Sequence, residues 1–303
     1  MVLACLALFP EAVRAQNQRR TPASEDLTRP SFKTLTVGSC PGERGERRDA
    51  EWSKKWEEHR NCSRARLMYP HYRRTPWMNR LIAQSIILPM FAERLDEKPA
   101  NGGGEALYKG KLMSLVQKGG ARGSVERPPP IDFAARLVGH EASSLSPAGV
   151  PRPELFGHYL QFVLSHELSQ RYDTRPEGQV SSFVVIDTRA RKVLTFDDLI
   201  LPGKEGTLEN LQLAAFRDWL RAERKLPNMA IRAHLANPSY AFRLNRNWRI
   251  GEGGLVFRFG VLEVGPLSFG AMEILVEKER LHDVVRPDIL EQIPGRGELT
   301  AGD

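Results

Sequence analysis

The sequence lacks an apolar stretch long enough to cross a bilayer. A membrane-spanning helix needs roughly 18–20 consecutive apolar residues, and the longest apolar run, Leu81 to Phe91, is interrupted by Gln84, Ser85 and Pro89. We therefore expect no transmembrane helix in the mature chain. Hydrophobic residues still make up 41% of the 303 residues, so the chain can bury a core.

A basic n-region is also lacking, yet the first fifteen residues are typical of the end of a secretory signal peptide. Met1 to Phe9 is a short apolar segment, and Val13-Arg14-Ala15 offers the residue types that signal peptidase reads. We predict that residues 1–15 are removed and that the mature protein is periplasmic or secreted. Lipoprotein anchoring through Cys5 is a less favoured alternative, because this cysteine lies too close to Met1. The second alternative is a cytosolic protein whose apolar N-terminus is frayed.

Cysteine is scarce, with three residues in the chain. Cys5 lies in the segment that we expect to be removed, which leaves Cys40 and Cys62. An even number of cysteines in an exported protein favours a disulfide. We predict a Cys40–Cys62 bridge, with two buried free thiols as the alternative.

Acidic residues are too few near the N-terminus to balance the basic ones. Residues 16–74 contain 14 Lys and Arg against 8 Asp and Glu, an excess of +6, whereas the whole chain carries +7. The basic balance therefore belongs to an N-terminal arm that could contact anionic lipid or cell-wall polymer. A solvated arm without a partner is the alternative. No nucleic-acid-binding motif is present, so we expect no nucleic acid partner.

Catalytic and cofactor motifs are missing as well. His166-Glu167 begins a zinc-protease pattern, but Gln170 stands where the second histidine belongs. No nucleophile elbow and no phosphate-binding glycine loop occurs. His158 and His166 could share one face of a strand, but a metal site there would need a carboxylate from elsewhere. We expect no enzyme activity, no cofactor and no metal, and read these histidines as surface or packing residues.

Segments with secondary-structure patterns begin near Arg66. Thr75 and Pro76 are good residues for the start of a helix, and Pro89 should end or kink it, with a second helical stretch at Met90 to Asp96. Glycine and proline clusters make the middle third loop-rich. Within it, Tyr159 to Leu168 alternates as a half-buried strand does.

The C-terminal part shows more regular patterns. Ser181 to Asp187 and Lys192 to Phe196 predict a hairpin around a turn at residues 188–191, which Asp197, Asp198 and Leu199 close. Thr207 could cap a helix that runs to Ala222. The other expected elements are strands at Tyr240–Leu244, Leu255–Phe259 and Glu273–Val276 and a short helix at Glu279–Val285.

Hairpins separated by isolated helices predict an α+β fold, with antiparallel β-sheets, a few packing helices and two small adjoining subdomains. The predicted divisions are a signal peptide (1–15), a basic, partly disordered arm (16–65), an N-terminal α+β domain (66–175), a C-terminal domain (176–290) and a tail (291–303).

Two segments carry a family resemblance. One is Ile186 to Leu199, and the other is Phe257 to Gly270 with the strand after it. Their order, with an amphipathic helix between them, resembles the C-terminal domain of the RsiV-like extracytoplasmic family. The segment from Tyr69 through the helix at Trp77 is similar to the PdaC-associated domain that precedes it in such proteins.

The resemblance implies a set of structural signature residues. In the second segment, Glu263, Gly265, Pro266 and Gly270 match the family order, and we interpret Glu263 as a turn residue that bonds nearby backbone N–H groups. In the first, Arg191 stands where the family commonly has glycine before lysine. The full signature set is Asp187, Lys192, Leu194, Asp198, Leu199, Phe259, Glu263, Gly265, Pro266 and Gly270.

Three hypotheses follow for the function. The leading one is a non-enzymatic binding module of the cell envelope for a protein or cell-wall ligand. Lysozyme is the ligand that the resemblance implies, although two basic proteins lose electrostatic steering. The alternatives are an enzyme that acts on peptidoglycan or another envelope polymer, with His158, His166, Glu167 and Asp198 as its obvious candidate residues, and a structural module that sits on anionic membrane through the basic arm.

Overall fold

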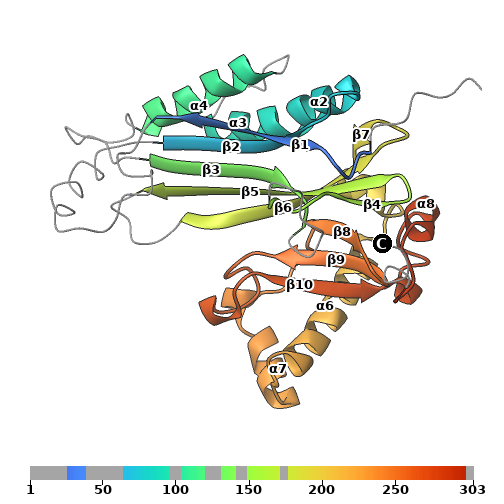
Figure 1. Ribbon diagram of the computed structural model, residues 1–303. Helices are drawn as coiled ribbons and strands as arrows, with labels where there is room; N and C mark the ends of the chain where they lie inside the picture. The colour runs from blue at the N-terminus through green and yellow to red at the C-terminus, as the bar shows by residue number, and fades with distance from the viewer. Residues whose placement is uncertain are drawn as a thin grey trace, which may run out of the picture.

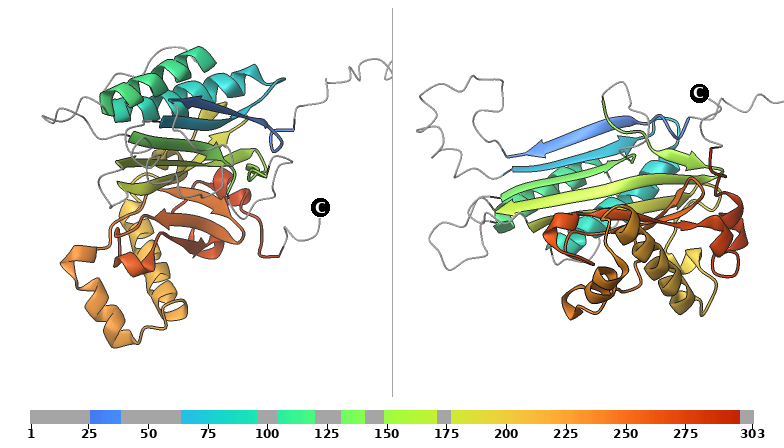
Figure 2. Two further views of the ribbon diagram at one scale, coloured as in Figure 1. Left: turned by 60° about the vertical axis from the view of Figure 1, so that its left-hand side comes forward. Right: turned by 90° about the horizontal axis from the view of Figure 1, so that it is seen from below.

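The computed structural model describes residues 26–38, 64–95, 104–119, 131–140, 149–170 and 177–297. These residues form four stacked layers (Figure 1). The N-terminal helices cover one face of a seven-stranded sheet, and a three-stranded sheet lies against part of its other face. Two C-terminal helices cover the far side of the smaller sheet (Figures 1 and 2). No helix among the described residues is long and apolar enough to cross a membrane.

The large sheet has the order β1–β2–β3–β5–β6–β7, and β4 pairs with the first residues of β5. The predicted α+β class is confirmed, but the sheet is mixed rather than wholly antiparallel, because β2 and β3 run parallel. A parallel pair needs a crossover connection, and the helices between these two strands provide it. The strands are β1 (Ser31–Val37), β2 (Arg64–His71), β3 (Ile131–Val138), β4 (Glu154–Phe156), β5 (Tyr159–Gln170), β6 (Glu177–Asp187) and β7 (Lys192–Val193).

Strand β1 lies within the segment that the sequence assigned to an arm. Four of its seven residues are polar, and Leu35 is its one buried side chain. It nevertheless pairs with β2 over its whole length, from Ser31 opposite His71 to Val37 opposite Ala65. Backbone pairing at a sheet edge needs little apolar burial, which is why composition alone did not reveal the strand. All three cysteines, and with them the predicted Cys40–Cys62 bridge, lie outside the described residues.

The N-terminal helices begin where the sequence indicated. Pro76 is the first residue of α2 (Pro76–Ile82). The helix continues through a π-helical turn at Ala83–Ile87 into α3 (Leu88–Leu95). Pro89 therefore does not end the helical path, and the wide turn before it is a known way of accommodating a residue that lacks an N–H. Helix α4 (Glu105–Gly119) occupies part of the region that we expected to be loops.

Several C-terminal expectations need correction. The second hairpin strand stops at Val193, because Thr195 caps the short helix α5. Helix α6 starts two residues before Thr207, and residues 241–247 form no strand. Residues 278–280 form a single 3₁₀ turn, and the next helix begins only at Pro287. The elements are α5 (Phe196–Leu199), α6 (Glu205–Ala222), α7 (Asn228–Leu235), β8 (Trp248–Gly251), β9 (Gly254–Phe259), β10 (Met272–Glu277) and α8 (Pro287–Glu291).

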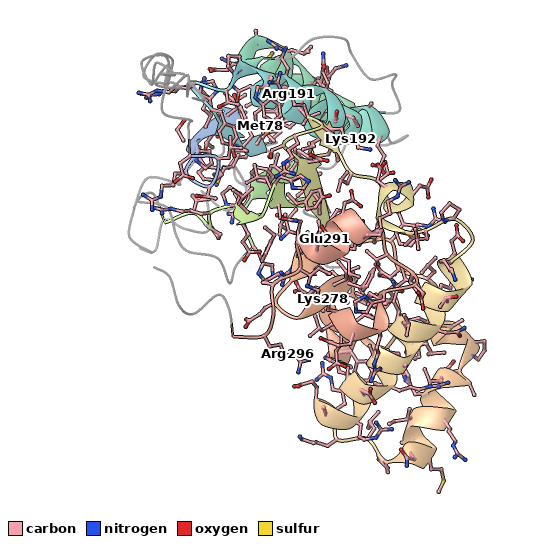
Figure 3. The ribbon with its side chains drawn as sticks, turned by 90° about the vertical axis from the view of Figure 1, so that its right-hand side faces the viewer. Met78, Arg191, Lys192, Lys278, Glu291 and Arg296 are labelled. Carbon is pink, nitrogen blue, oxygen red and sulfur yellow. The ribbon has the colours of Figure 1, made fainter. Side chains whose placement is uncertain are left out.

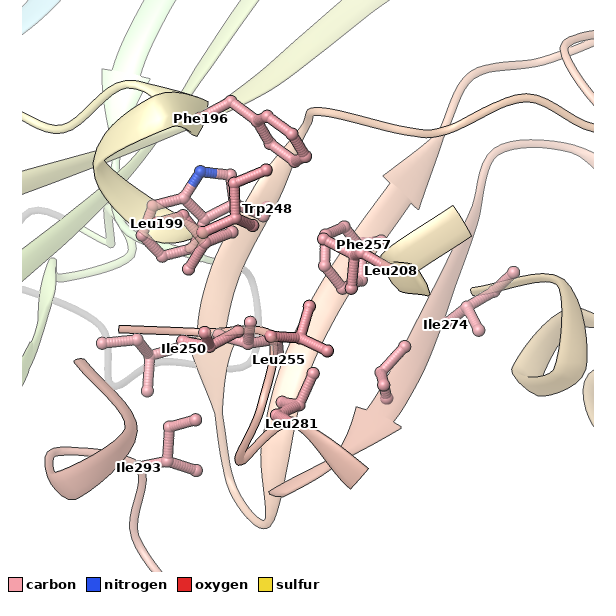
Figure 4. Packing of buried hydrophobic residues seen from close by; sticks show 14 of the residues in the cluster. Phe196, Leu199, Leu208, Trp248, Ile250, Leu255, Phe257, Ile274, Leu281 and Ile293 are labelled. Atoms are coloured by element: carbon pink, nitrogen blue, oxygen red, sulfur yellow. The ribbon is translucent and has the colours of Figure 1, made fainter. Parts of the chain in front are cut away.

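Two hydrophobic cores lie on opposite faces of the large sheet. The first is between the sheet and α2–α4 and includes Phe162 and Ile186. The second fills the space around the three-stranded sheet, α6 and α8 and includes Val185 (Figure 4). Strand β6 thus contributes to both cores. The predicted domain boundary at residues 175 and 176 falls between β5 and β6, which are neighbours in one sheet.

Candidate functional site

The face of the large sheet that turns away from α2–α4 carries a pocket. On β3, Ala134, Arg136 and Val138 lie on this face, since the residues between them are buried in the first core. Ser165 of β5 and Ser181 of β6 extend the same surface. The pocket has a volume of about 460 Å³ and an open mouth. Its floor combines small apolar groups with two hydroxyl groups.

Three basic side chains surround this floor: Arg136, His140 and Arg258. Arg136 is exposed, and it makes no hydrogen bond or ion pair with any described residue. Its guanidinium group is therefore available to a ligand. The rim beside His140 is closely packed, because the Gly139 N–H donates to the carbonyl of Pro151 at 2.9 Å.

The other two basic groups are shared with the carboxylate of Glu273 on β10. Nε2 of His140 lies 3.2 Å from Oε1 of Glu273, and Nη1 of Arg258 lies 3.5 Å from the same oxygen. Arg249 donates to Oε2 at 3.2 Å. Burial by itself would raise the pKa of the Glu273 carboxyl, but the hydrogen bond from His140 and the nearby Arg249 guanidinium outweigh it and lower the pKa to about 2. Glu273 is therefore ionised over the whole physiological pH range.

An aromatic ring lies under this ion cluster. The guanidinium carbons of Arg249 and Arg258 are 5.3 and 6.0 Å from the ring centre of Phe183 on β6, and the His140 ring is 6.2 Å away. Cations over an aromatic face are attracted to it. The cluster thus joins the end of β3 and strand β6 to β8, β9 and β10, and its structural role is to dock the small sheet on the large one beside the pocket.

Two amide side chains complete this docking. Gln161 of β5 is buried and bonds both backbone groups of Ile250, with its Nε2 donating to the carbonyl at 3.0 Å and its Oε1 accepting from the N–H at 2.6 Å. Asn247 does the same for the edge of β6, where it accepts from the Phe183 N–H and donates to the Ser181 carbonyl. The two amides thus provide hydrogen-bond partners to backbone groups of β8 and β6, as a neighbouring strand would.

The signature residues of the first hairpin hold its turn. Oδ1 of Asp187 accepts from the N–H groups of Arg189 and Ala190, and Arg191 has a φ of 54°. This left-handed conformation suits glycine, which is the residue that the RsiV-like resemblance leads us to expect there. The Arg191 guanidinium lies 5.2 Å from the ring centre of Trp77 in α2. Figure 3 labels Arg191 and Met78, the residue after Trp77.

Asp198 and its neighbours stabilise the start of α5. The carboxylate of Asp198 accepts from the Thr195 N–H at 2.9 Å, the hallmark of a capping box. The hydrogen bond from Lys192, at 2.5 Å, and that from the Thr195 backbone lower the pKa of Asp198 to about 2. Leu194 donates its N–H to Val185, and Leu199 is fully buried. Asp198, which we expected to close the hairpin, thus caps the helix that follows the hairpin.

The signature residues of the second segment shape the β9–β10 connection. Oε2 of Glu263 accepts from the Gly260 N–H at 2.6 Å, as predicted for a turn residue. A Cβ at Gly265 would clash with the ring of Phe269. Pro266 precedes a 3₁₀ turn that ends at Gly270, whose φ of 69° and ψ of −165° are essentially confined to glycine. Phe259 is fully buried in the second core.

The residues suggested for an enzyme do not converge. His158 precedes β5 and His166 lies near its other end, so eight residues at 3.3 Å each separate them by about 26 Å. His166-Glu167 lies in a strand, whereas the zinc-protease pattern requires a helix. Asp198 serves as a cap. Among the residues that the structure describes, no group of three or more His, Cys, Asp or Glu could hold a metal ion.

The sequence analysis proposed none of the pocket residues as functional, and Ser181 was named there only as the start of a strand. Arg136 and Arg258 come from strands that are far apart in the sequence, and the small residues between them have no motif. The one available signal was the alternation at residues 133–138, which places Ala134 and Arg136 on one face of a strand.

The fold is similar to those of two crystal structures of DUF3298 family proteins. One is from Pseudomonas aeruginosa PAO1, with a TM-score of 0.57 and 18% sequence identity over 89% of this chain and 100% of that one. The other is from Bacteroides fragilis NCTC 9343, with a TM-score of 0.56 and 12% identity over 89% of this chain and 99% of that one. No family model and no curated protein matches the chain, so the RsiV-like resemblance depends on the sequence motifs alone.

Proposed function

We propose that this protein is a non-enzymatic binding module of the cell envelope, and that its pocket holds an anionic group of a protein or cell-wall ligand. The observation that carries the proposal is the exposed guanidinium of Arg136, which has no partner among the described residues and stands over an open pocket. An arginine in this position can bind a carboxylate through two parallel hydrogen bonds.

The rest of the pocket fits such a ligand. Arg258 bonds Glu273 through Nη1 at 3.5 Å, which is a long contact that leaves other guanidinium N–H groups for a ligand. Ser165 and Ser181 can donate or accept hydrogen bonds. Ala134 and Val163 leave space for small apolar groups. A peptide segment with small side chains and a carboxylate combines all these features.

The same charges argue against a basic ligand in this pocket. Lysozyme is the ligand that the RsiV-like resemblance implies, and typical lysozymes are strongly basic. A cationic pocket repels such a surface. We therefore expect any lysozyme contact to lie elsewhere on the molecule.

Calorimetry with soluble peptidoglycan fragments that carry free stem-peptide carboxylates tests the proposal. We expect Arg136→Glu to weaken binding by tenfold or more, since a charge-assisted hydrogen bond contributes about 1.5–3 kcal/mol and the new carboxylate repels the ligand. Arg80→Glu is the matched control, because Arg80 is exposed on α2 at the opposite face of the sheet. Absence of binding by the unaltered protein, or equal weakening in both variants, would contradict the proposed site.

A further inference from the structure

A second surface exposes large apolar side chains to solvent. It consists of residues 224–246, which include α7, and the β9–β10 connection at 260–270, and we call it the α7 lobe. Four of its side chains are exposed: Met229 by 81%, Leu267 by 70%, Leu262 by 56% and Val261 by 42%. Figures 1 and 2 place α7 on the side of the small sheet that faces away from the large sheet, so this surface is separate from the pocket.

The exposed side chains stand on a well-packed base. Nε2 of His234 in α7 lies 2.8 Å from the carbonyl oxygen of Val264. The guanidinium of Arg224 donates to the Phe269 carbonyl at 2.7 Å and lies 4.9 and 5.0 Å from the ring centres of Trp219 and Phe269. These contacts tie α7 to the β9–β10 connection. The exposed apolar groups are thus held in place rather than left at a frayed end.

Leu262 is held outward at an energetic cost. Its φ of 66° is in the left-handed region, which is a clear outlier for a bulky residue and is energetically unfavourable. The hydrogen bond between Glu263 and the Gly260 N–H closes the turn around it. Backbone strain of this kind gathers at sites of interaction. A strained turn that presents Val261 and Leu262 to solvent therefore points to a docking role.

The charge of the lobe indicates the kind of partner. The lobe contains five Lys and Arg, all within residues 224–246, and one acidic residue, Glu263 in the β9–β10 connection. Lys225, Arg232 and Arg243 are exposed. On the outer face of α7 and at its C-cap, Met229, Arg232, Ala233 and Ala236 are exposed. Apolar side chains next to an excess of basic ones are typical of helices that lie in the interface of anionic membranes.

We propose that the α7 lobe docks on an anionic phospholipid surface. Met229, Leu262 and Leu267 insert among the upper acyl chains, while the basic side chains reach the headgroups along their own aliphatic stems. The apolar groups come from three separate short segments, α7, the turn at 260–263 and the 3₁₀ turn at Leu267–Phe269, and project as individual tips. Tips of this kind suit a fluid lipid interface, which adapts to their spacing. The inference does not depend on the function of the pocket.

Vesicle sedimentation of the full chain tests this inference. The probes are phosphatidylcholine vesicles with and without phosphatidylglycerol. We expect binding to the phosphatidylglycerol-containing vesicles. The triple variant Met229→Ser, Leu262→Ser, Leu267→Ser should bind them about tenfold or more weakly, since three apolar side chains no longer leave water on binding. The matched control is Met113→Ser, Leu155→Ser, which alters exposed apolar residues on α4 and β4.

A second pair of variants tests the charges. Arg232→Glu with Arg243→Glu should weaken binding to the anionic vesicles more than Lys109→Glu with Arg189→Glu, which makes the same charge change elsewhere on exposed positions. Circular dichroism checks that each variant is folded. Failure of the unaltered chain to bind would overturn the inference and favour an acidic protein partner. Binding that is equally strong in the triple variant would overturn it as well, since the N-terminal basic segment would then carry the contact.

Discussion

At the scale of single residues, two amide side chains replace missing strand neighbours. A strand edge leaves N–H and C=O groups that need partners. Gln161 supplies partners to Ile250 of β8, and Asn247 supplies them to Phe183 and Ser181 of β6. Gln161 reaches β8 from the face of the large sheet, because β5 is an inner strand of that sheet. The two sheets are therefore linked by side chains and stay distinct.

Replacing Gln161 should show how much this arrangement stabilises the fold. Gln161→Leu keeps the volume but leaves the N–H of Ile250 without its partner, whereas the Ile250 carbonyl still accepts from Nη1 of Arg249 at 3.3 Å. We expect a loss of about 1–3 kcal/mol in the free energy of unfolding, which is the cost of one unsatisfied buried group. Urea denaturation measures it. Gln84→Leu, at an exposed position of the π-helical turn, is the control, and an equal loss in both variants would show that the Gln161 bonds are unimportant.

At the scale of elements, the connections depend on a few backbone conformations. The turn before β7 places Arg191 at positive φ, and the connection before β10 places Leu262 and Gly270 there. Of these, Gly270 has the combination of φ and ψ that other residues avoid most strongly. Its conformation directs the chain from the 3₁₀ turn into β10, whose side chains include Glu273.

A pair of glycine substitutions tests this view. Gly270→Ala should lower the free energy of unfolding by about 1–3 kcal/mol through backbone strain alone, because nothing lies within 4 Å of the added Cβ. Gly110→Ala, in the interior of α4 and equally open, should raise it by about 0.5–1 kcal/mol, since alanine is the better helix former. Thermal denaturation of the two variants should give shifts of opposite sign. Shifts of the same sign would contradict the argument from conformation.

At the scale of the whole molecule, the ion cluster around Glu273 connects the two sheets. The free carboxyl has a reference pKa of 4.5, and the folded protein lowers it to about 2. A carboxyl with a lower pKa in the folded state stabilises that state above the unfolded pKa. The stabilisation is therefore complete above about pH 5 and is lost as the pH falls from about 4.5 towards 2.

Glu273→Gln should remove this dependence. We expect the variant to be less stable at pH 7 by on the order of 2–3 kcal/mol and to lose less stability between pH 5 and pH 2 than the unaltered protein. Glu277→Gln on the same strand is the control, because its ion pairs with Arg280 and Arg296 are largely exposed and contribute little. Urea denaturation across this pH range measures both, and parallel pH profiles for the unaltered protein and Glu273→Gln would contradict the assignment.

The local features of this protein could be predicted from the types and spacing of neighbouring residues. The proline after Thr75 marks the start of α2, alternation predicts β5, and the residue types from Ser181 onward predict β6 and the turn at 188–191. The α+β class follows from the order of these elements. Such features depend on interactions between residues a few positions apart, which the sequence records directly.

The sheet order, the pairing of β1 and the pocket could be recognised only from the tertiary structure. The pairing of β1 with β2 joins residues 40 positions apart at Ser31 and His71 and needs hardly any apolar side chain. The approach of Arg136, His140 and Arg258 depends on how the small sheet docks on the large one, through Gln161, Asn247 and Glu273. Those contacts involve single polar side chains without a repeating pattern, because their hydrogen bonds depend on position in space and not on spacing along the chain.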